Sequence, residues 1–310
     1  MKKLSVVLVM LFVVVFSVSG LSAGKVKVGF IATNFSSEAQ ARVAKAFEDD
    51  VKKRGWELVK LNSMGSIETQ SSQLENLVQM KVDAIVMAMG HPAEIKSAVD
   101  KVLAAGIPLI TIDSGYVEGV VADITADNFV MGAKVSTYLL DSLGGSGNII
   151  VIKFQKHQGC RRRGKVLDAV LSEYPNIHVL DEYGVVATAK FLDDTRSAME
   201  TYVLKYGDKI DGVWCAFDQL AYVAADVLAE YGYKDKLVVG VDGNAETFKR
   251  IKNGKMTATV AQPLEAMAVR AVEIVDKIVV KKMDPNTAAG NKIIYVDAPL
   301  IDSTNLPRGY

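Results

Sequence analysis

Two aspartates stand directly after apolar runs that are typical of buried β-strands. Asp113 follows the run PLITI in PLITIDSG, and Asp242 follows LVVGV in LVVGVDGN. An ionised carboxylate accepts hydrogen bonds on two oxygens, so each aspartate could bind two neighbouring hydroxyl groups of a ligand. Asp-Ser and Asp-Gly are also common turn pairs, so the alternative for each residue is a turn or a helix cap.

A run of three arginines could supply cations to the same ligand. Arg161, Arg162 and Arg163 precede the expected helix GKVLDAVLSEY, at the end of the helix dipole that disfavours positive charge. A solvated basic face is the alternative. The position of the run favours an anionic or polyol partner for at least one arginine. Apolar spacing onward to Val166 and Ala169 favours Arg162, with Arg161 second.

The chain offers little to catalysis or to metal binding. It holds only His91, His157 and His178, with no G-x-S-x-G elbow, no H-E-x-x-H motif and no Gly-rich phosphate loop. His157, in the loop FQKHQGC, is the histidine that could touch a ligand. Cys160 and Cys215 are too few for a disulfide scaffold or a thiolate metal site; two free thiols or one disulfide remain open. We therefore expect no enzyme, no cofactor and no metal.

Composition and length limit the possible partners and the number of domains. The chain has 310 residues, 50% of them hydrophobic, and 36 basic against 36 acidic side chains. A balanced charge disfavours nucleic acid and anionic membrane surfaces as partners. The length predicts two domains.

The amino terminus is typical of a secretory signal. Lys2 and Lys3 precede an apolar stretch from Val6 to Val15 and the small-residue segment SVSGLSA, so cleavage is expected after Gly20 or Ala23. The apolar stretch is shorter than the roughly 20 residues of a membrane-spanning helix, which is the alternative. Residues 1–23 are thus expected to be removed, which predicts a periplasmic protein.

The elements that must position the two aspartates alternate along the chain. Apolar runs typical of strands occur at residues 26–33, 57–61, 84–88 and 108–112, and again at 148–154, 178–181, 212–216 and 237–241. Stretches with helical spacing separate them, which predicts α/β lobes with parallel sheets covered on both faces. Corresponding strands lie roughly 120 to 130 residues apart, which indicates two similar lobes. Asp113 and Asp242 then end equivalent strands, on facing rims of one cleft.

The chain resembles the periplasmic sugar-binding proteins of the ribose and galactose type, which serve ABC transporters. The resemblance rests on KVGFIATN, AAGIPLITIDS, the ADN of residues 126–128, VVGVDG and TATVAQP. Bacterial repressors share these lobes but carry a helix-turn-helix where this chain has its signal segment. The resemblance implies two doubly wound parallel-sheet lobes joined by three crossovers, one lobe of residues 25–125 plus 263–290 and the other of 126–262 plus 291–310.

The resemblance also implies ligand contacts. Matching positions are Asp113, Asp242, Gln262, one arginine of CRRRG, and Phe191, whose ring would pack on the apolar face of a sugar.

Other positions depart from the ribose-binding pattern. Asp193 replaces an arginine, Phe217 an asparagine and Met89 an amide, while Gln40, with Ser37 ahead of it, stands where ribose binders carry aromatic rings. These departures predict a hydroxyl-rich ring other than ribose.

We therefore expect a solute-binding protein that captures an uncharged sugar or cyclic polyol, such as a hexose, pentose or inositol. A hinge would close the lobes around the ligand, and an ABC transporter permease would receive it. A sensor that presents a signal molecule to a membrane receptor is the alternative, and an enzyme acting on a sugar is a remote one. We expect a monomer.

Overall fold

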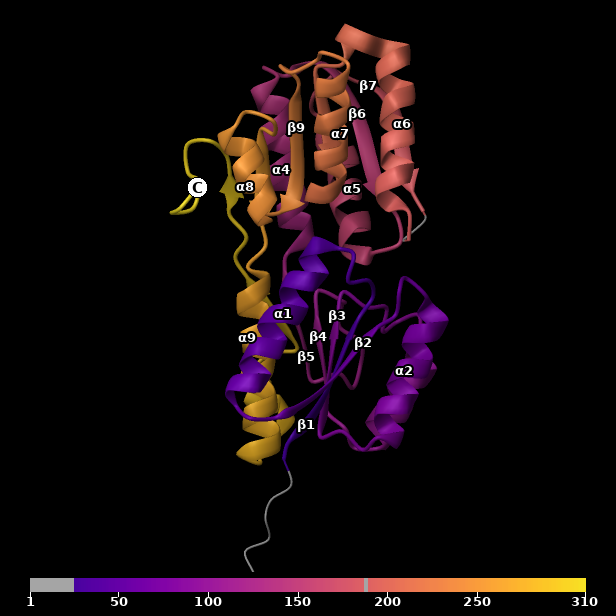
Figure 1. The fold of residues 1–310 in the computed structure, drawn as a ribbon, viewed down its shortest axis with the longest axis vertical. Coiled ribbons are helices and arrows are strands. Elements are labelled where there is room, and N and C mark those ends of the chain that lie inside the picture. The colour runs from indigo at the N-terminus through magenta and orange to yellow at the C-terminus, as the bar shows by residue number, and fades with distance from the viewer. Residues whose placement is uncertain (1–24, 187–188) are drawn as a thin grey trace, which may run out of the picture.

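The computed structural model describes residues 25–186 and 189–310. The predicted signal segment, residues 1–23, lies outside the described residues. The described chain forms two α/β lobes, stacked along the long axis of the molecule in Figure 1.

The first lobe is built on a six-stranded sheet in the order β11-β5-β4-β3-β1-β2, all pairs parallel. Its strands are β1 (Lys27–Ala32), β2 (Glu57–Asn62), β3 (Ala84–Ala88), β4 (Leu109–Ile112), β5 (Ala122–Ala126) and β11 (Ile293–Val296). Its helices are α1 (Glu38–Lys53), α2 (Ile67–Gln79), α3 (Lys96–Ala104), α9 (Leu264–Val275), the π-helical turn η2 (Asp276–Val280) and α10 (Pro285–Ala289). Helices α1 and α9 pack together, as do α2 and α3. Figure 1 shows α1 and α9 on one side of the sheet and α2 on the other.

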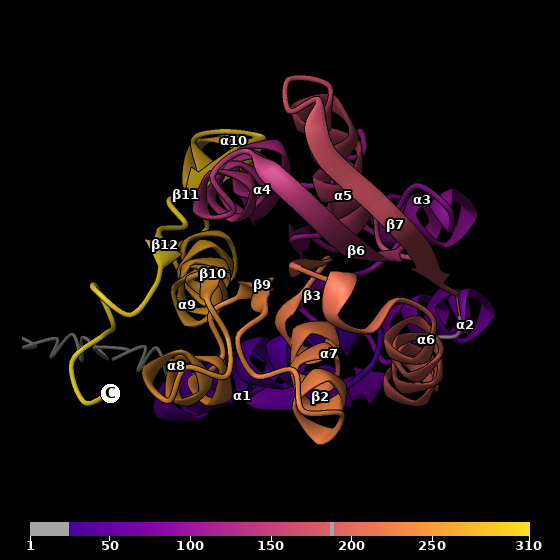
Figure 2. The ribbon, with the colours of Figure 1, turned by 90° about the horizontal axis from the view of Figure 1, so that it is seen from above.

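The second lobe repeats this plan with the order β12-β10-β9-β8-β6-β7, in which all pairs are parallel except β10 and β12, which pair antiparallel. Its strands are β6 (Ser146–Phe154), β7 (Asn176–Val185), β8 (Gly212–Cys215), β9 (Leu237–Asp242), β10 (Ala258–Ala261) and β12 (Leu300–Ile301). Its helices are α4 (Asn128–Ser142), α5 (Gln158–Leu171), α6 (Phe191–Tyr206), the 3₁₀ turn η1 (Gly207–Lys209), α7 (Asp218–Glu230) and α8 (Ala245–Lys252). Helices α4 and α5 pack together, as do α6 and α7, which the view from above in Figure 2 also shows.

The central strands are apolar because the helices cover both of their faces. Every residue of β3, β4 and β8 is buried. Strands β4 and β9 occupy the same position in the two sheet orders, third from the β11 or β12 edge. This confirms the predicted architecture of two similar parallel-sheet lobes, and it puts Asp113 and Asp242 at the tips of equivalent strands.

The chain crosses between the lobes three times, and the third crossover corrects the predicted boundary. The first lies between β5 and α4 and the second between β10 and α9. The third lies between β11 and β12, at residues 297–299, and not at residue 291. Residues 293–296 belong to the first lobe because β11 pairs in parallel with β5, so only the segment that includes β12 returns to the second lobe.

Candidate ligand-binding site

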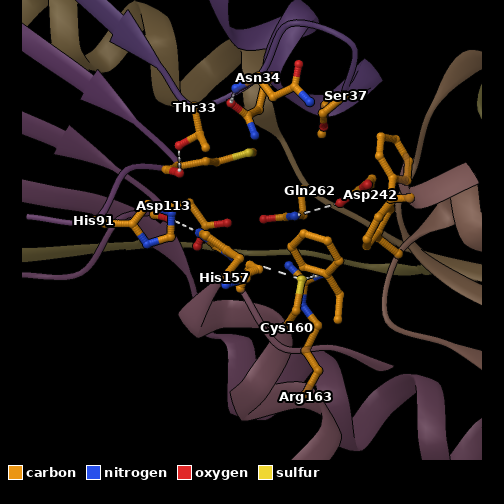
Figure 3. A pocket seen from close by; sticks show the side chains of 17 residues that line it. Thr33, Asn34, Ser37, His91, Asp113, His157, Cys160, Arg163, Asp242 and Gln262 are labelled. Atoms are coloured by element: carbon orange, nitrogen blue, oxygen red, sulfur yellow. Dashed lines mark hydrogen bonds between the residues drawn. The ribbon is translucent and has the colours of Figure 1, made fainter. Parts of the chain in front are cut away.

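A pocket lies between the lobes, where the carboxyl ends of both sets of strands meet (Figure 3). Open parallel sheets bind ligands at this end because strand tips and helix amino termini converge there. The pocket is lined by Thr33, Asn34, Ser37, Ala39, Gln40, Met89, His91, Asp113, Phe154, Lys156, His157, Cys160, Arg163, Phe191, Phe217, Asp242 and Gln262.

Asp113 follows β4 and is the carboxylate of the first lobe in this pocket. Its Oδ1 accepts hydrogen bonds from Thr125 Oγ1 at 2.9 Å and from Asn128 Nδ2 at 2.8 Å. Its side chain is buried, and among residues 25–186 and 189–310 both of the side chains that donate to it bind the Oδ1 atom. Oδ2 is therefore available to accept hydrogen bonds from a ligand.

Arg163 is the buried cation of the site. Its Nε donates to Asn128 Oδ1 at 2.8 Å, and one of its terminal nitrogens donates to the carbonyl oxygen of Ala216 at 2.8 Å. Asn128 thus bridges Arg163 to Asp113 through its two amide atoms. This arrangement fixes the guanidinium and the carboxylate relative to each other without pairing them directly, so each keeps hydrogen-bonding capacity for a ligand.

Asp242 ends β9 and is the carboxylate of the second lobe. Its Oδ1 accepts a hydrogen bond from Gln262 Nε2 at 2.9 Å. Burial, together with the nearby Asp218 carboxylate, raises the pKa of Asp242 to about 7, whereas Arg163 opposes the shift. The Oε1 atom of Gln262 is buried without a hydrogen-bond partner among the described residues. A buried acceptor of this kind is stabilised by a donor from a ligand.

A second buried carboxylate supports each strand tip. In the first lobe, Asp123 accepts hydrogen bonds from the backbone N–H groups of Ser114 (3.2 Å) and Gly115 (3.1 Å), the two residues after Asp113. In the second lobe, Asp218 accepts from the N–H of Asn244 at 3.1 Å. Burial raises the pKa of Asp123 to about 6 and also raises that of Asp218.

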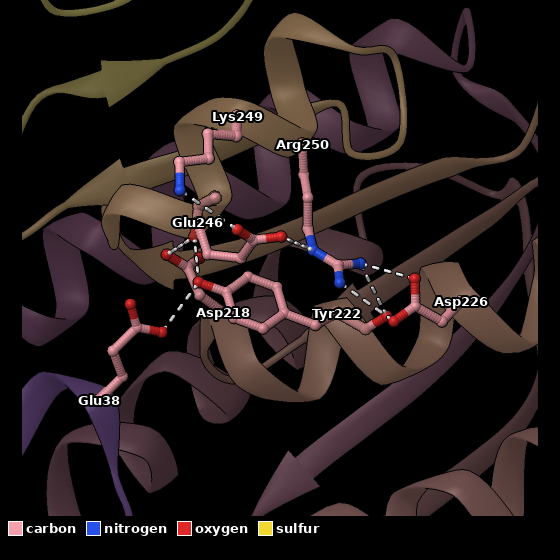
Figure 4. Close-up of polar contacts among 8 residues, drawn as sticks. Glu38, Asp218, Tyr222, Asp226, Glu246, Lys249 and Arg250 are labelled. Atoms are coloured by element: carbon pink, nitrogen blue, oxygen red, sulfur yellow. Dashed lines mark hydrogen bonds and ion pairs between the residues drawn. The ribbon is translucent and has the colours of Figure 1, made fainter. Parts of the chain in front are cut away.

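The hydroxyl groups of Thr247 and Thr259 complete the support in the second lobe. They donate to the two oxygens of Asp218 at 2.6 and 2.7 Å. Figure 4 shows Asp218 within a polar network that joins helices α7 and α8. The loops that follow Asp113 and Asp242 are thus fixed by hydrogen bonds to buried side chains that do not line the pocket.

Three rings form an apolar wall on the second lobe. Phe217 packs edge-on against Phe154, with ring centroids 5.5 Å apart and planes at 86°, and lies 5.6 Å from Phe191. The first lobe lines the pocket without any aromatic ring other than the imidazole of His91. A ligand ring would therefore have one face for apolar contact with the phenylalanines and would meet mainly polar groups and Met89 elsewhere.

Three strand tips have backbone conformations that side chains rarely adopt. Met89, Asp113 and Asp242 have φ angles of 48°, 46° and 144°. Such outliers cost energy and cluster at functional sites. Gly243, next to Asp242, has φ 67°, and a Cβ there would lie 2.4 Å from that of Ala261, so only glycine fits.

The loop after β1 and the first turn of α1 bring polar groups from the first lobe. Gln40 lines the pocket, and its Oε1 accepts a hydrogen bond from the backbone N–H of Asn34 at 2.8 Å. Thr33 donates to the carbonyl oxygen of Met89 at 2.6 Å, which ties the tips of β1 and β3 together. Ser37 stands at the N-cap of α1 without capping the helix through its side chain.

His157 reaches from the second lobe to the first. Its Nε2 lies 2.8 Å from the carbonyl oxygen of Asp113, and because a carbonyl only accepts, Nε2 carries the proton. Burial lowers the pKa of His157 to about 4. Cys160 and Cys215 are both buried and free, which settles the open question of a disulfide. Burial raises the pKa of the Cys160 thiol to about 12, which makes it a poor nucleophile.

The structure brings most of the sequence-predicted residues together. Those that line the pocket are Asp113, Asp242, Gln262, Phe191, Phe217, Gln40, Ser37 and Met89.

The three predicted residues that do not line the pocket are two arginines and one aspartate. Arg161 donates to the carbonyl oxygen of Gln155, and the Arg162 guanidinium lies 5.4 Å from the ring centroid of the exposed Phe129. Arg163 takes the place expected for Arg162. Asp193 is exposed on the first turn of α6.

Sequence reasoning missed further pocket residues. These are Thr33, Asn34, Ala39, His91, Phe154, Lys156 and Cys160. Several of them end a strand or follow it within three residues, as Thr33 and Asn34 do after β1 and His91 does after β3. The sequence signal for these residues is their position at the end of an apolar run. All such runs had to be considered, and not only the two that end in an aspartate.

No group of three or more histidine, cysteine, aspartate or glutamate side chains within residues 25–186 and 189–310 is placed to hold a metal ion. In the same part of the chain, every helix is too short or too polar to cross a membrane.

Comparison with known proteins identifies the family. Residues 28–283 match the model of the periplasmic binding protein domain, and the chain belongs to this family. It is 29% identical over 257 residues to the ribose import binding protein of Bacillus subtilis (strain 168), which covers 81% of each chain. It is also 29% identical over 209 residues to a xylitol-binding protein of Mycolicibacterium smegmatis, covering 66% of this chain and 59% of that protein.

Solved structures share the fold. An ABC transporter solute-binding protein from Agrobacterium vitis, solved with bound allitol, superposes with a TM-score of 0.79 at 24% identity, over 90% of this chain and 96% of that one. The predicted resemblance to periplasmic sugar-binding proteins is thereby confirmed. The relatives named here are binding proteins and not enzymes.

Proposed function

We propose that this protein is an extracytoplasmic solute-binding protein that captures an uncharged sugar or cyclic polyol between its lobes and delivers it to an ABC transporter. The observation that carries the proposal is the pair of buried carboxylates, Asp113 and Asp242, on facing lobes of one pocket. Each has one oxygen held by protein donors and one left for a ligand. The relatives, which by name bind ribose and xylitol, support an uncharged ligand rich in hydroxyl groups.

The polar groups of the pocket suit hydroxyl groups, which both donate and accept. Asp113, Asp242 and the unpartnered Oε1 of Gln262 offer acceptors, whereas Arg163 offers donors. Charge-assisted hydrogen bonds of this kind contribute roughly 1.5 to 3 kcal/mol each. The phenylalanine wall formed by Phe154, Phe191 and Phe217 would pack against the C–H face of the ring.

A phosphorylated sugar would meet two carboxylates as like charges, which favours a neutral ligand. The exposed Asp193 contributes nothing to this repulsion, so the preference rests on Asp113 and Asp242 alone. Among the described residues, Arg163 is the only arginine that lines the pocket, and two of its nitrogens are already engaged by Asn128 and Ala216.

A thermal-shift screen tests ligand binding. D-ribose, D-allose, xylitol, allitol and myo-inositol are compared with ribose 5-phosphate as the charged control. A neutral polyol at about 100 times its dissociation constant should stabilise the fold by roughly 2.7 kcal/mol, whereas the phosphate ester should not. Stabilisation by ribose 5-phosphate alone would overturn the neutral-ligand assignment. Recovery of a chemically altered polyol after incubation would indicate an enzyme instead.

Delivery is tested separately from binding. Deletion of the gene should abolish high-affinity uptake of the radiolabelled polyol that the screen identifies. Normal uptake together with a lost behavioural or transcriptional response to that polyol would support the sensor alternative.

A further inference from the structure

Helix α1 of the first lobe carries an arginine that lies behind the pocket. The Nε and one terminal nitrogen of Arg42 donate to the two carboxylate oxygens of Glu265 on α9, at 2.8 and 2.9 Å. Both helices belong to the first lobe, so this bidentate pair holds the guanidinium in place on its own lobe. The Arg42 side chain is 21% exposed, so water screens its contacts only in part.

The remaining donors of Arg42 cross to the second lobe. The Nη1 atom donates to the carbonyl oxygens of Asp242 (3.0 Å) and Gly243 (3.2 Å) and to Asn244 Oδ1 (2.9 Å). The Nη2 atom donates to the carbonyl oxygen of Gln262 at 3.4 Å. One guanidinium therefore binds the tips of β9 and β10 together, and these tips carry two of the pocket's polar side chains.

This contact acts on a backbone that is under strain. Asp242 has φ 144°, and its carbonyl oxygen also accepts from the backbone N–H of Gln262 at 3.0 Å. Arg42 donates a hydrogen bond to the same carbonyl oxygen from the other lobe. The orientation of the Asp242 peptide group determines where the Asp242 carboxylate points. The Arg42 side chain therefore affects both the contact between the lobes and the geometry of this carboxylate.

A second contact of α1 with the other lobe provides an internal comparison. Tyr222 on α7 donates to Glu38 Oε2 at 3.2 Å, as Figure 4 shows, and Gln219 accepts from the backbone N–H of Glu38 at 2.7 Å. None of these three residues lines the pocket. Among the described residues, this contact joins the lobes without a hydrogen bond to the carbonyl oxygens of Asp242 or Gln262, although the Tyr222 hydroxyl also lies 2.8 Å from the Thr247 hydroxyl that supports Asp218.

We propose that Arg42 is a positioning residue that couples closure of the two lobes to the placement of Asp242 and Gln262, through its forked hydrogen bonds to their backbone carbonyls. The effect on ligand affinity rests on the function proposed above, but the effect on closure does not. The fork is essential because four separate acceptors on the second lobe are bound while Glu265 is bound on the first. A lysine ammonium is a point charge and cannot reproduce that geometry.

The test measures the ratio of closed to open molecules by double electron–electron resonance. Spin labels are attached through Lys53→Cys on the first lobe and Glu173→Cys on the second, both exposed positions, while Cys160 and Cys215 remain buried. Arg42→Met, Arg42→Lys, Glu265→Gln and Tyr222→Phe are compared with the unsubstituted chain. Distances are recorded without polyol and with xylitol, D-ribose or myo-inositol.

We expect Arg42→Met to lower the closed-to-open ratio at least tenfold and Arg42→Lys to lose most of the same factor. Glu265→Gln, which keeps one acceptor, and Tyr222→Phe should each change the ratio less. A ratio in Arg42→Lys equal to that of the unsubstituted chain would reduce Arg42 to an ordinary ion-pair partner and overturn the proposal. So would a change of less than twofold in Arg42→Met.

The measurements with polyol separate the proposed ligand class from the proposed role of Arg42. If no polyol stabilises the unsubstituted chain, the proposed ligand class fails, while the ratios measured without polyol still decide the role of Arg42. Melting curves of each variant establish that it folds, and Arg42→Lys remains informative if Arg42→Met does not.

Discussion

The side-chain amide of Asn128 donates to Asp113 Oδ1 at 2.8 Å, although Asp113 follows a strand of the first lobe and Asn128 begins the first helix of the second. Asn128 stands directly after the first crossover, so the chain itself brings the two residues together. Its amide oxygen accepts from Arg163, which is also buried. One neutral side chain thus orients both charged groups.

Replacement of Asn128 should damage both stability and binding. Asn128→Ala leaves the buried Asp113 and Arg163 each short of one partner, which should lower the free energy of unfolding by about 1 to 3 kcal/mol. Urea denaturation measures this loss. The neighbouring Asp127 caps α4 by accepting from the N–H groups of Phe129 and Val130, so Asp127→Ala should cost about 1 kcal/mol and leave polyol affinity unchanged. Equal affinity in both variants would refute the role given to Asn128.

Asp242 should make the stability of the protein depend on pH. Its pKa is raised from 3.8 to about 7, mainly by burial, so the folded state binds more protons than the unfolded state between these values. The free energy of unfolding should therefore fall as pH rises from about 4 to 7, with a slope of at most about 1.4 kcal/mol per pH unit from this group. Asp242→Asn should flatten the slope, as measured by denaturation at a series of pH values.

The same substitution should weaken binding. An amide offers one acceptor oxygen where the carboxylate offers two, so Asp242→Asn should reduce polyol affinity about ten- to a hundred-fold in calorimetric titrations. Asp193→Asn is the matched control because Asp193 is exposed outside the pocket. If both variants bind as tightly as the unsubstituted chain, Asp242 is a turn residue and not an anchor.

The phenylalanine wall should contribute to affinity through its shape. Phe191→Leu keeps the site apolar but removes the flat ring face, and we expect a loss of about three- to tenfold in polyol affinity, equivalent to about 0.6 to 1.4 kcal/mol. Phe129→Leu, a change to a ring that is 50% exposed and outside the pocket, should have no effect. Isothermal titration with the polyol identified by thermal shift measures the difference.

The two thiols should be unreactive while the protein is folded. Burial raises the pKa of Cys160 to about 12 and that of Cys215 well above its usual range, so neither forms a thiolate at pH 8. Iodoacetamide should modify both rapidly in denaturant and neither in the native protein, as mass spectrometry shows. Fast native modification of Cys160 would indicate that the pocket opens far more than this structure does.

The architecture was predictable because parallel sheets impose a clear pattern. Strands β3, β4 and β9 are buried on both faces, so they read as continuous apolar runs, and Asp113 and Asp242 are conspicuous at their ends. The pairing of these two residues across one pocket follows from the internal repeat. Tertiary features such as the Asn128 bridge cannot be read in the same way, because they depend on which residues of distant segments meet.

The contributing arginine was mispredicted because the rotation of α5 was misjudged. Val166 and Ala169 suggested a buried face that includes Arg162, but Ala169 is exposed in the structure. The buried positions of α5 are Gly159, Cys160, Arg163, Gly164 and Leu167. Leu167 stands four residues after Arg163 and Cys160 three before it, a spacing that indicates Arg163 once the helix is known to begin at Gln158.

The third crossover was misplaced for a different reason. Strand β11 has four residues and alternates between exposed and partly buried positions, so it lacks the continuous apolar run of the central strands. Its partner is set by the register with β5, in which Ile293 lies opposite Asp123 and Val296 opposite Ala126. Such an edge strand is specified by pairing more than by composition.

The positions of β11 and β12 determine the order in which the protein can be completed during synthesis. The first lobe begins at residue 27 but receives α9 and its edge strand only after the whole of β10 has been made, and the second lobe receives its own edge strand at residues 300–301. A chain that emerges from its amino terminus therefore cannot complete the first sheet before residue 296 has been made, nor the second before residue 301. Loss of a short carboxyl-terminal segment would expose an unpaired strand in both sheets at once.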